Sequence, residues 1–146
     1  MEIEIKIDET VKEPKIIVVT DKMTEEVSQI IKRFSEDGEK TIAGFQDGIA
    51  KVLEPDSLFR VYASNGKVLA QTSHGEYQLR LRLYELEQRL DGHFFVRISN
   101  SEIINLKRVK GFDLSFAGTI CVMLSNGTVT YVSRRYVAKI KKILGI

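Results

Sequence analysis

The chain has 146 residues, of which 43% are hydrophobic and 29% are charged, with a net charge of +2 and a single cysteine, Cys121. This length suits one domain, or one domain with an appendage, that buries a core of its own. The sequence excludes a membrane span of roughly 18 apolar residues, a secretory signal at its acidic start and an internal disulfide, so we expect a cytoplasmic protein.

The first 39 residues predict two strands followed by a helix. Charged and apolar residues alternate over Glu2–Asp8, and Lys15–Thr20 is a second short run rich in β-branched residues. A helix should begin at Thr24 and stop near Gly38, with one apolar face formed by Val27, Ile30, Ile31 and Phe34. A β-β-α extension over residues 1–39 is too small to be stable alone, so we expect it to make a dimer or regulatory contact.

From Lys40 the hydrophobic period changes to two, which is typical of strands. The expected strands of this part are Thr41–Phe45, Ile49–Leu53, Phe59–Ala63, Lys67–Thr72 and Tyr77–Leu81. Asn65-Gly66 is the strongest short hairpin signal in the chain. Leu83, Leu86 and Leu90 then follow helical spacing and predict a short helix with a buried stripe.

The stretch from Phe94 to Leu106 changes character in its middle. Phe94 and Phe95 lead a buried strand that breaks at Ser99-Asn100-Ser101, three small polar residues that favour turns. Apolar residues then return at Ile103 and Ile104. A polar tip held between apolar anchors is how a scaffold presents a loop to a partner.

The rest of the chain repeats the alternation and ends in a helix. The further expected strands are Val109–Leu114, Thr119–Leu124 and Thr128–Val132. Ser133 should cap a last helix whose buried face is Val137, Ile140, Ile143 and Leu144. Many short strands with two short helices predict a mostly β, antiparallel domain over residues 40–146.

The charge is divided unevenly along the chain. Residues 1–59 have a net charge of −6, whereas residues 60–146 have a net charge of +8. A basic half indicates an anionic partner, and nucleic acid is the commonest one, because Lys and Arg neutralise phosphates. The alternative is a solvated basic face with no partner.

The sequence contains no convincing catalytic set. His74 and His93 stand apart, and Cys121 lies inside an expected strand, where a core residue is the simpler interpretation. The glycines do not form a phosphate-binding loop. We therefore expect a protein that is not an enzyme and that has neither a metal site nor a cofactor.

An ordered set of motifs over Lys40–Ile146 resembles the LytTR family of DNA-binding domains, found in bacterial transcription regulators. The motifs are Leu83-x-x-Leu86-x-x-x-Leu90, Phe95-Val96-Arg97-x-Ser99-Asn100-Ser101, Ile104-Asn105 and Val132-Ser133-Arg134-Arg135-Tyr136. The resemblance implies an antiparallel LytTR-like β domain that places loops, instead of a recognition helix, into successive major grooves. It also implies a homodimer on paired repeats of double-stranded DNA.

Most members of the family carry an N-terminal receiver domain with a phosphorylatable aspartate. The segment before residue 40 is too short for one, so the chain resembles the stand-alone type and phosphorelay control is not expected. Regulators of that type are often encoded beside a small inhibitory membrane protein, which the resemblance makes an expected partner.

The resemblance also suggests which residues bind DNA. Asn100 matches the family's base-contacting loop, and an amide suits the edge of adenine. Arg135 would contact guanine or a phosphate, while the third contact would come from Asn65 or Lys67. Lys107 and Arg108 would hold phosphates. The full set of expected DNA-binding residues is Asn100, Arg135, Arg134, Asn65, Lys67, Arg97, Ser99, Lys107 and Arg108.

Several of these residues have structural alternatives. Asn100 could cap its own turn, and Arg97 could pair with Glu85 or Glu87 instead of contacting DNA. Arg134 could support the helix start, whereas Ser99, Ser101 and Asn105 would fix the pose of the polar loop. The competing function is a protein-interaction module that binds a membrane or regulatory partner through the extension, with an incidental basic face.

Overall fold

The computed structural model of the chain describes residues 1–34 and 41–146. The chain divides into two compact units, Met1–Gly38 and Glu39–Ile146, which are described one at a time. Among the described residues, no helix combines the length and the apolar character that crossing a bilayer requires.

The N-terminal unit contains one helix, α1, at Glu25–Phe34. Thr24 caps it as expected, because its Oγ1 accepts a hydrogen bond from the backbone N–H of Val27 at 3.3 Å. Glu25 and Glu26 occupy the first turn, where negative charge is favourable. The expected stop at Gly38 lies outside the described residues.

The two strands predicted in this unit are wrong. Glu2–Asp8 and Lys15–Thr20 form no strand, and instead Asp8 accepts hydrogen bonds from the backbone N–H and the hydroxyl of Thr10 in a local turn. Alternation alone does not make a strand, because the backbone of a strand needs a neighbouring strand for its hydrogen bonds. The extension is therefore one helix preceded by irregular chain.

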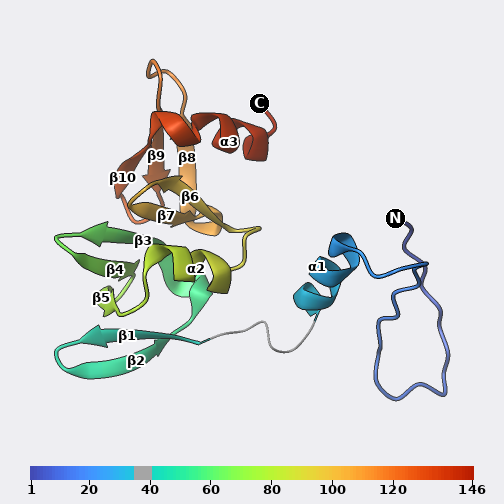
Figure 1. Cartoon of the computed structure of the whole chain (residues 1–146). Coiled ribbons are helices and arrows are strands. Elements are labelled where there is room, and N and C mark those ends of the chain that lie inside the picture. The colour runs from blue at the N-terminus through green and yellow to red at the C-terminus, as the bar shows by residue number, and fades with distance from the viewer. Residues whose placement is uncertain (35–40) are drawn as a thin grey trace. The chain divides into compact units, whose positions relative to one another are not determined.

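The second unit is built on two antiparallel sheets, and Figure 1 shows them one above the other. The larger sheet has seven strands in the order β2-β1-β5-β4-β3-β7-β6. Its strands are β1 (Ile42–Gln46), β2 (Ile49–Leu53), β3 (Leu58–Ser64), β4 (Lys67–Thr72), β5 (Gly75–Leu79), β6 (Phe95–Ser99) and β7 (Glu102–Asn105). The smaller sheet has the order β10-β9-β8, with strands β8 (Val109–Asp113), β9 (Ile120–Leu124) and β10 (Val129–Val132).

Four short helices complete this unit. They are η2 (Pro55–Ser57) and η3 (Leu106–Arg108), both of the 3-10 type, and the α-helices α2 (Leu83–Arg89) and α3 (Arg134–Leu144). The prediction of a mostly β, antiparallel domain with two α-helices is confirmed, and each expected strand lies within two residues of an observed one. The agreement follows from a clear period of two and from strong turn signals between the strands.

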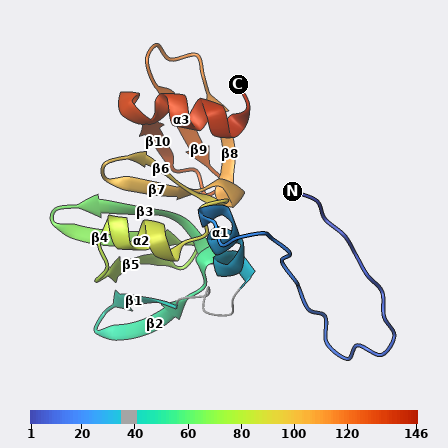
Figure 2. The same ribbon diagram turned by 45° about the vertical axis from the view of Figure 1, so that its right-hand side comes forward.

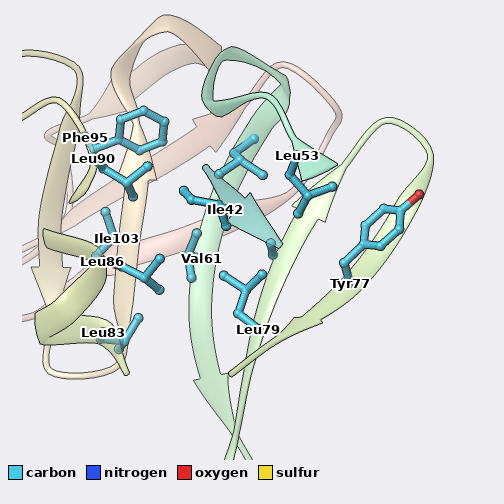
Figure 3. Packing of buried hydrophobic residues seen from close by; sticks show 12 residues of the cluster. Ile42, Leu53, Val61, Tyr77, Leu79, Leu83, Leu86, Leu90, Phe95 and Ile103 are labelled. Atoms are coloured by element: carbon cyan, nitrogen blue, oxygen red, sulfur yellow. The ribbon is translucent and has the colours of Figure 1, made fainter. Parts of the chain in front are cut away.

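The first core lies between the larger sheet and α2 (Figure 3). The stripe predicted on the helix, Leu83, Leu86 and Leu90, is buried there. Its members from the sheet are Ile42, Leu53, Leu58, Val61, Ala70, Tyr77, Leu79, Phe95 and Ile103. Since α2 has only seven residues, burial of this stripe stabilises it far more than helix propensity does.

The second core joins the larger sheet to the smaller sheet and α3. Its buried members are Phe59, Val96, Ile98, Ile104, Ile120, Val122, Leu124, Val132 and Ile140. Strand β7 belongs to both cores, because Ile103 packs in the first and Ile104 in the second. All four of its residues are buried, because this strand has one core on each side.

Two expectations about burial are wrong. Phe94 lies before β6 and is 37% exposed, with the Nζ of Lys107 lying 4.1 Å from its ring centroid. Ile143 on α3 is 43% exposed, because α3 faces the second core with Ile140, which is fully buried, and with Val137 and Leu144, which pack partly against it. Cys121 is buried in β9, as predicted.

Candidate nucleic-acid interface

Asn100 lies at the tip of the hairpin between β6 and β7. Ser99 pairs with Glu102 across this hairpin, which leaves Asn100 and Ser101 as a two-residue turn. The Oγ of Ser99 accepts a hydrogen bond from the backbone N–H of Ser101 at 3.2 Å. Ser99 therefore closes the turn, and the side chain of Asn100 is left exposed at the tip.

Arg97 stabilises this turn by hydrogen bonds to its backbone. Its Nε donates to the carbonyl of Ser99 at 2.8 Å and its Nη2 donates to the carbonyl of Asn100 at 2.6 Å. Its Nη1 forms an ion pair with Glu87 on α2, one of the two acidic partners predicted for it. Because its side chain is only 15% exposed, Arg97 presents its donors mainly to the protein.

The motif Val132–Tyr136 lies against the same turn. The backbone N–H of Ser133 donates to the carbonyl of Ile98 at 2.9 Å, which joins the end of β10 to β6. The hydroxyl of Tyr136 lies 3.4 Å from Oδ1 of Asn100, a long hydrogen bond. The two motifs are 30 residues and more apart in the sequence, and the fold makes them neighbours.

Arg134 and Arg135 are the first two residues of α3, and both are exposed. Positive side chains at a helix N-terminus oppose the helix dipole, so they cost stability where they stand. Ser133 occupies the capping position as predicted, but its side chain makes no capping hydrogen bond. Backbone N–H groups and two guanidinium groups together suit an anion such as a phosphate.

The third turn joins β3 to β4 and lies beside Asn100. The backbone N–H of Ala63 donates to the carbonyl of Ser101 at 2.8 Å, so the two hairpins end together. Asn65 and Gly66 have φ values of 51° and 73°, the left-handed pair that a two-residue hairpin requires. Asn65 therefore suits the backbone conformation of this turn. Lys67 is also exposed, and the turn itself does not require a lysine at that position.

Tyr62 keeps a neutral phenol close to this turn. Its hydroxyl donates to Oε1 of Glu76 at 2.5 Å. Burial first, and this hydrogen bond second, raise the pKa of Tyr62 above its ordinary value. A phenol of ordinary pKa is already neutral at pH 7, so this shift leaves the charge beside the third turn unchanged, and the acidic side chain there is that of Glu76.

We call these three segments, Ser64–Lys67, Ser99–Ser101 and Ser133–Tyr136, the rim. Figures 1 and 2 show them on one side of the second unit, where the β3–β4 and β6–β7 hairpins end and α3 begins. The rim contains three basic residues and no acidic one. Segments that expose amide, guanidinium and ammonium groups and have no carboxylate of their own suit a polyanion.

Two further residues at or beside the rim were given no role by the sequence patterns. Tyr136 touches Asn100, and it was visible as the last residue of its motif. Arg80 directly follows β5, whose Leu79 pairs with Val68 next to the third turn, and its guanidinium lies 4.0 Å above the ring of Phe45. The alternation of Arg80 with apolar neighbours could have indicated it.

Lys107 and Arg108 do not belong to the rim. They follow Asn105 at the far end of β7, and both bind Asp56, Lys107 through an ion pair of 3.3 Å and Arg108 through two hydrogen bonds to the carbonyl. Asn105 is fully buried there and donates to the carbonyl of Leu58 at 2.8 Å. Its expected role at the polar loop is wrong, because a whole strand separates the two.

The described residues hold no cluster of three or more His, Cys, Asp or Glu side chains that is placed to bind a metal ion.

Comparison with known proteins gives consistent results. The model of a family described as the LytTr DNA-binding domain matches residues 50–145. An uncharacterized HTH-type transcriptional regulator of Staphylococcus aureus strain NCTC 8325 is 34% identical over 147 residues, which cover 100% of this chain and 99% of the relative. A second such regulator, from strain MSSA476, is 36% identical over 126 residues, covering 86% of this chain and 85% of the relative.

A solved structure supports the fold. The chain is similar to a LytTr DNA-binding domain from Bacillus cereus, with a TM-score of 0.71 at 20% sequence identity. The match covers 75% of this chain and 100% of that one. It agrees with the mostly β architecture that the sequence predicts.

Proposed function

Because the chain belongs to the LytTR family of DNA-binding domains, we propose that it is a sequence-specific transcription regulator whose rim reads duplex DNA in the major groove. One observation carries this proposal: two hairpin turns and the start of α3, from separate parts of the sequence, meet at one place, and their own residues supply basic and amide groups and no carboxylate. The family is one of DNA-binding domains and not of enzymes, in agreement with the sequence.

We assign direct contacts to the exposed residues of the rim. Asn100 offers a donor and an acceptor to a base edge. Arg135 binds guanine or a phosphate, and Arg134 binds a phosphate beside it. Lys67 and Asn65 supply the contact of the third turn. In this arrangement Arg97 and Ser99 act on DNA through the turn that they hold, since their polar atoms bond the turn itself.

The fold favours loops over a recognition helix. A helix-turn-helix places two consecutive helices a few residues apart. Here five strands separate α2 from α3 in the described chain, and Arg134 and Arg135 in the first turn of α3 are exposed beside the Asn100 turn. The relatives from Staphylococcus aureus are named as HTH-type regulators; for this chain we propose readout by turns instead.

Lys107 and Arg108 receive a smaller role. They lie a strand length from Asn100, and each already bonds Asp56. We propose that they contact phosphates only, where the DNA continues past the rim. Their removal would then weaken binding to all sequences equally.

We further propose that the protein acts in the cytoplasm as a homodimer on paired repeats, and that the N-terminal unit supplies the contact. Support comes from apolar side chains of this unit that are exposed, which is costly unless a partner covers them. They include Ile3, Ile5, Ile7, Ile16, Ile17, Val19 and Phe34. A small inhibitory membrane protein is the alternative occupant of the same surface.

The competing function is a protein-interaction module that uses only this N-terminal surface. It predicts binding to a membrane or regulatory partner with no measurable affinity for DNA. The exposed apolar side chains suit either function, so DNA binding decides between them.

Footprinting on the DNA upstream of the protein's own gene tests the proposal. We expect two protected segments about one helical turn apart, since a dimer with two-fold symmetry reads paired half-sites. Protection in only one isolated segment would argue against the dimer. Absence of protection at concentrations that saturate non-specific DNA would contradict sequence-specific regulation.

A further inference from the structure

Glu102 is a buried carboxylate that follows the Asn100 turn directly. It is the first residue of β7 and is 6% exposed. A buried carboxylate costs free energy unless charged and hydrogen-bonding partners surround it. The partners of Glu102 come from two other strands, and each of these strands leads to another part of the rim.

The first partner is Arg60 on β3. Its Nη1 lies 2.7 Å from Oε1 of Glu102 in an ion pair. The guanidinium stacks on the ring of Tyr62 at 4.1 Å, and its buried Nε has no hydrogen-bond partner in the described chain. Glu102 therefore provides the charge that holds this arginine, and β3 continues from it into the Asn65 turn.

The second partner is Thr130 on β10. Its hydroxyl donates to Oε2 of Glu102 at 2.5 Å, which connects the smaller sheet to the larger one. Two residues later β10 ends at Val132, and Ser133 begins the third part of the rim. The two oxygens of one carboxylate are thus divided between the strands that lead to the other two segments.

A second polar connection between the two sheets does not reach the rim. Gln71 of β4 accepts hydrogen bonds from Asn126 and Thr128 at 3.1 and 3.3 Å. These residues lie at and beside the β9–β10 turn, which is the other end of β10 from Ser133. Their contact joins the sheets away from the rim.

We propose that Glu102 is a positioning residue that sets the spacing of the three rim segments, through Arg60 to the Asn65 turn and through Thr130 to the start of α3. This inference rests on the proposed function, because spacing matters only if the three segments contact one ligand together. A rigid ligand such as duplex DNA rewards fixed spacing, since side chains held in place lose less entropy on binding. Glu102 touches no DNA in this account.

Thr130→Val tests this role with little change in shape. Valine keeps the branched side chain and removes the hydroxyl, so the connection to β10 is lost while Arg60 and Glu102 stay paired. Thr130→Ser keeps the hydroxyl and should rescue the connection. Ile42→Val is the control, since Ile42 lies in the first core on a strand that does not lead to the rim. It should lower the stability of the protein and leave the Thr130–Glu102 hydrogen bond intact.

The first readout is a distance in the free full-length protein. Spin labels at Ala63→Cys and Ala138→Cys, in a Cys121→Ala background, report the spacing between the end of β3 and α3 by pulsed electron resonance. We expect Thr130→Val to broaden or shift the distance distribution, whereas Thr130→Ser and Ile42→Val keep that of the parent protein. An unchanged distribution in Thr130→Val would overturn the inference, whatever happens on DNA.

The second readout is the affinity for the footprinted duplex and for a scrambled one. We expect Thr130→Val to weaken specific binding roughly five- to tenfold, about the effect of one lost hydrogen bond, and to change scrambled binding less than about twofold. Equal losses on both duplexes, or a loss matched by Ile42→Val, would overturn the positioning role. Failure of the proposed function looks different, because the unmodified protein would then bind both duplexes equally.

Discussion

At the scale of single residues, the rim separates side chains that hold the surface from side chains that it presents. Arg97 and Ser99 use their polar atoms to bond the Asn100 turn. The side chains of Arg134, Arg135 and Lys67 are exposed, as is that of Asn100, which has only the long hydrogen bond from Tyr136. The two groups make different predictions. Loss of a presented side chain should affect DNA and leave the fold intact, and loss of a bracing side chain should affect both.

Arg135→Ala is the test of a presented side chain. If Arg135 reads a base, its loss should cost about 1–3 kcal/mol of binding free energy on the specific duplex and relax preference at one base pair. Fluorescence anisotropy on duplexes that differ at single positions measures this, with Lys139→Ala, an exposed residue further along α3, as the control. An equal loss on every sequence would assign Arg135 to a phosphate.

Glu87→Gln is the test of a bracing side chain. It removes the negative partner of Arg97 but keeps the shape, so the Asn100 turn loses part of its support. The pair is partly exposed, and we therefore expect a loss of only about 0.5–1 kcal/mol in the free energy of unfolding, together with weaker specific binding. Urea denaturation and anisotropy measure the two effects. Gln88→Ala, on the exposed face of the same helix, should change neither.

The sequence could indicate the presented residues and could not place the bracing ones. Asn100 was visible because polar residues interrupt an apolar run there, and Arg135 was suggested by the resemblance to the LytTR family. Arg97 pairs with Glu87 and not with Glu85 because of the side of α2 that faces β6. No local sequence pattern indicates that orientation. Asn105 looked like part of the polar loop because it is close in sequence, yet β7 carries it to the opposite end.

At the scale of elements, the short helix α2 depends on packing for its stability. Leu86 is its most buried residue, with 0% exposure, and it lies in the first core (Figure 3). Leu86→Ala should lower the free energy of unfolding by about 2–5 kcal/mol, because it removes buried apolar atoms and leaves a cavity. Tyr84→Ala, at a position 61% exposed on the same helix, should cost far less in the same urea titration. Equal losses would mean that α2 is not packed as described.

The elements also show where periodicity succeeds and fails as a guide. The strands of the second unit were predictable because each has a turn signal and a neighbouring strand at hairpin distance. The N-terminal runs have a similar alternation, yet within residues 1–34 no partner strand takes their hydrogen bonds, and they remain irregular. The hydrophobic pattern indicates which side chains could be buried, but a strand forms only where a neighbouring strand pairs with it.

At the scale of the whole molecule, the two units have separate tasks in our account. Both cores lie within the second unit, so it should fold without the first. A chain of residues 41–146 should therefore keep the circular dichroism spectrum and the melting cooperativity of a β domain. Analytical ultracentrifugation should show it as a monomer, whereas the full chain sediments as a dimer. A truncated chain that is still dimeric would remove the proposed contact from the N-terminal unit.

The charge division fits this separation of tasks. The rim and its surroundings lie in the part of the sequence with a net charge of +8, and the N-terminal unit lies in the part with −6. Negative side chains repel the phosphates of DNA, so the acidic part should not contribute to phosphate contacts. This asymmetry was readable from the sequence alone, but it could not tell which basic residues share a surface, since that depends on the strand order.

The central claim is that this protein distinguishes one duplex sequence from others, and one titration tests it. Fluorescence anisotropy of the full chain with the footprinted duplex and with a scrambled duplex of equal length, at moderate salt, gives the ratio of the two affinities. We predict a ratio of about 10³ or more, typical of specific DNA-binding proteins, and affinity for both duplexes that falls as salt rises. Equal affinity for the two duplexes at every salt concentration would contradict the account.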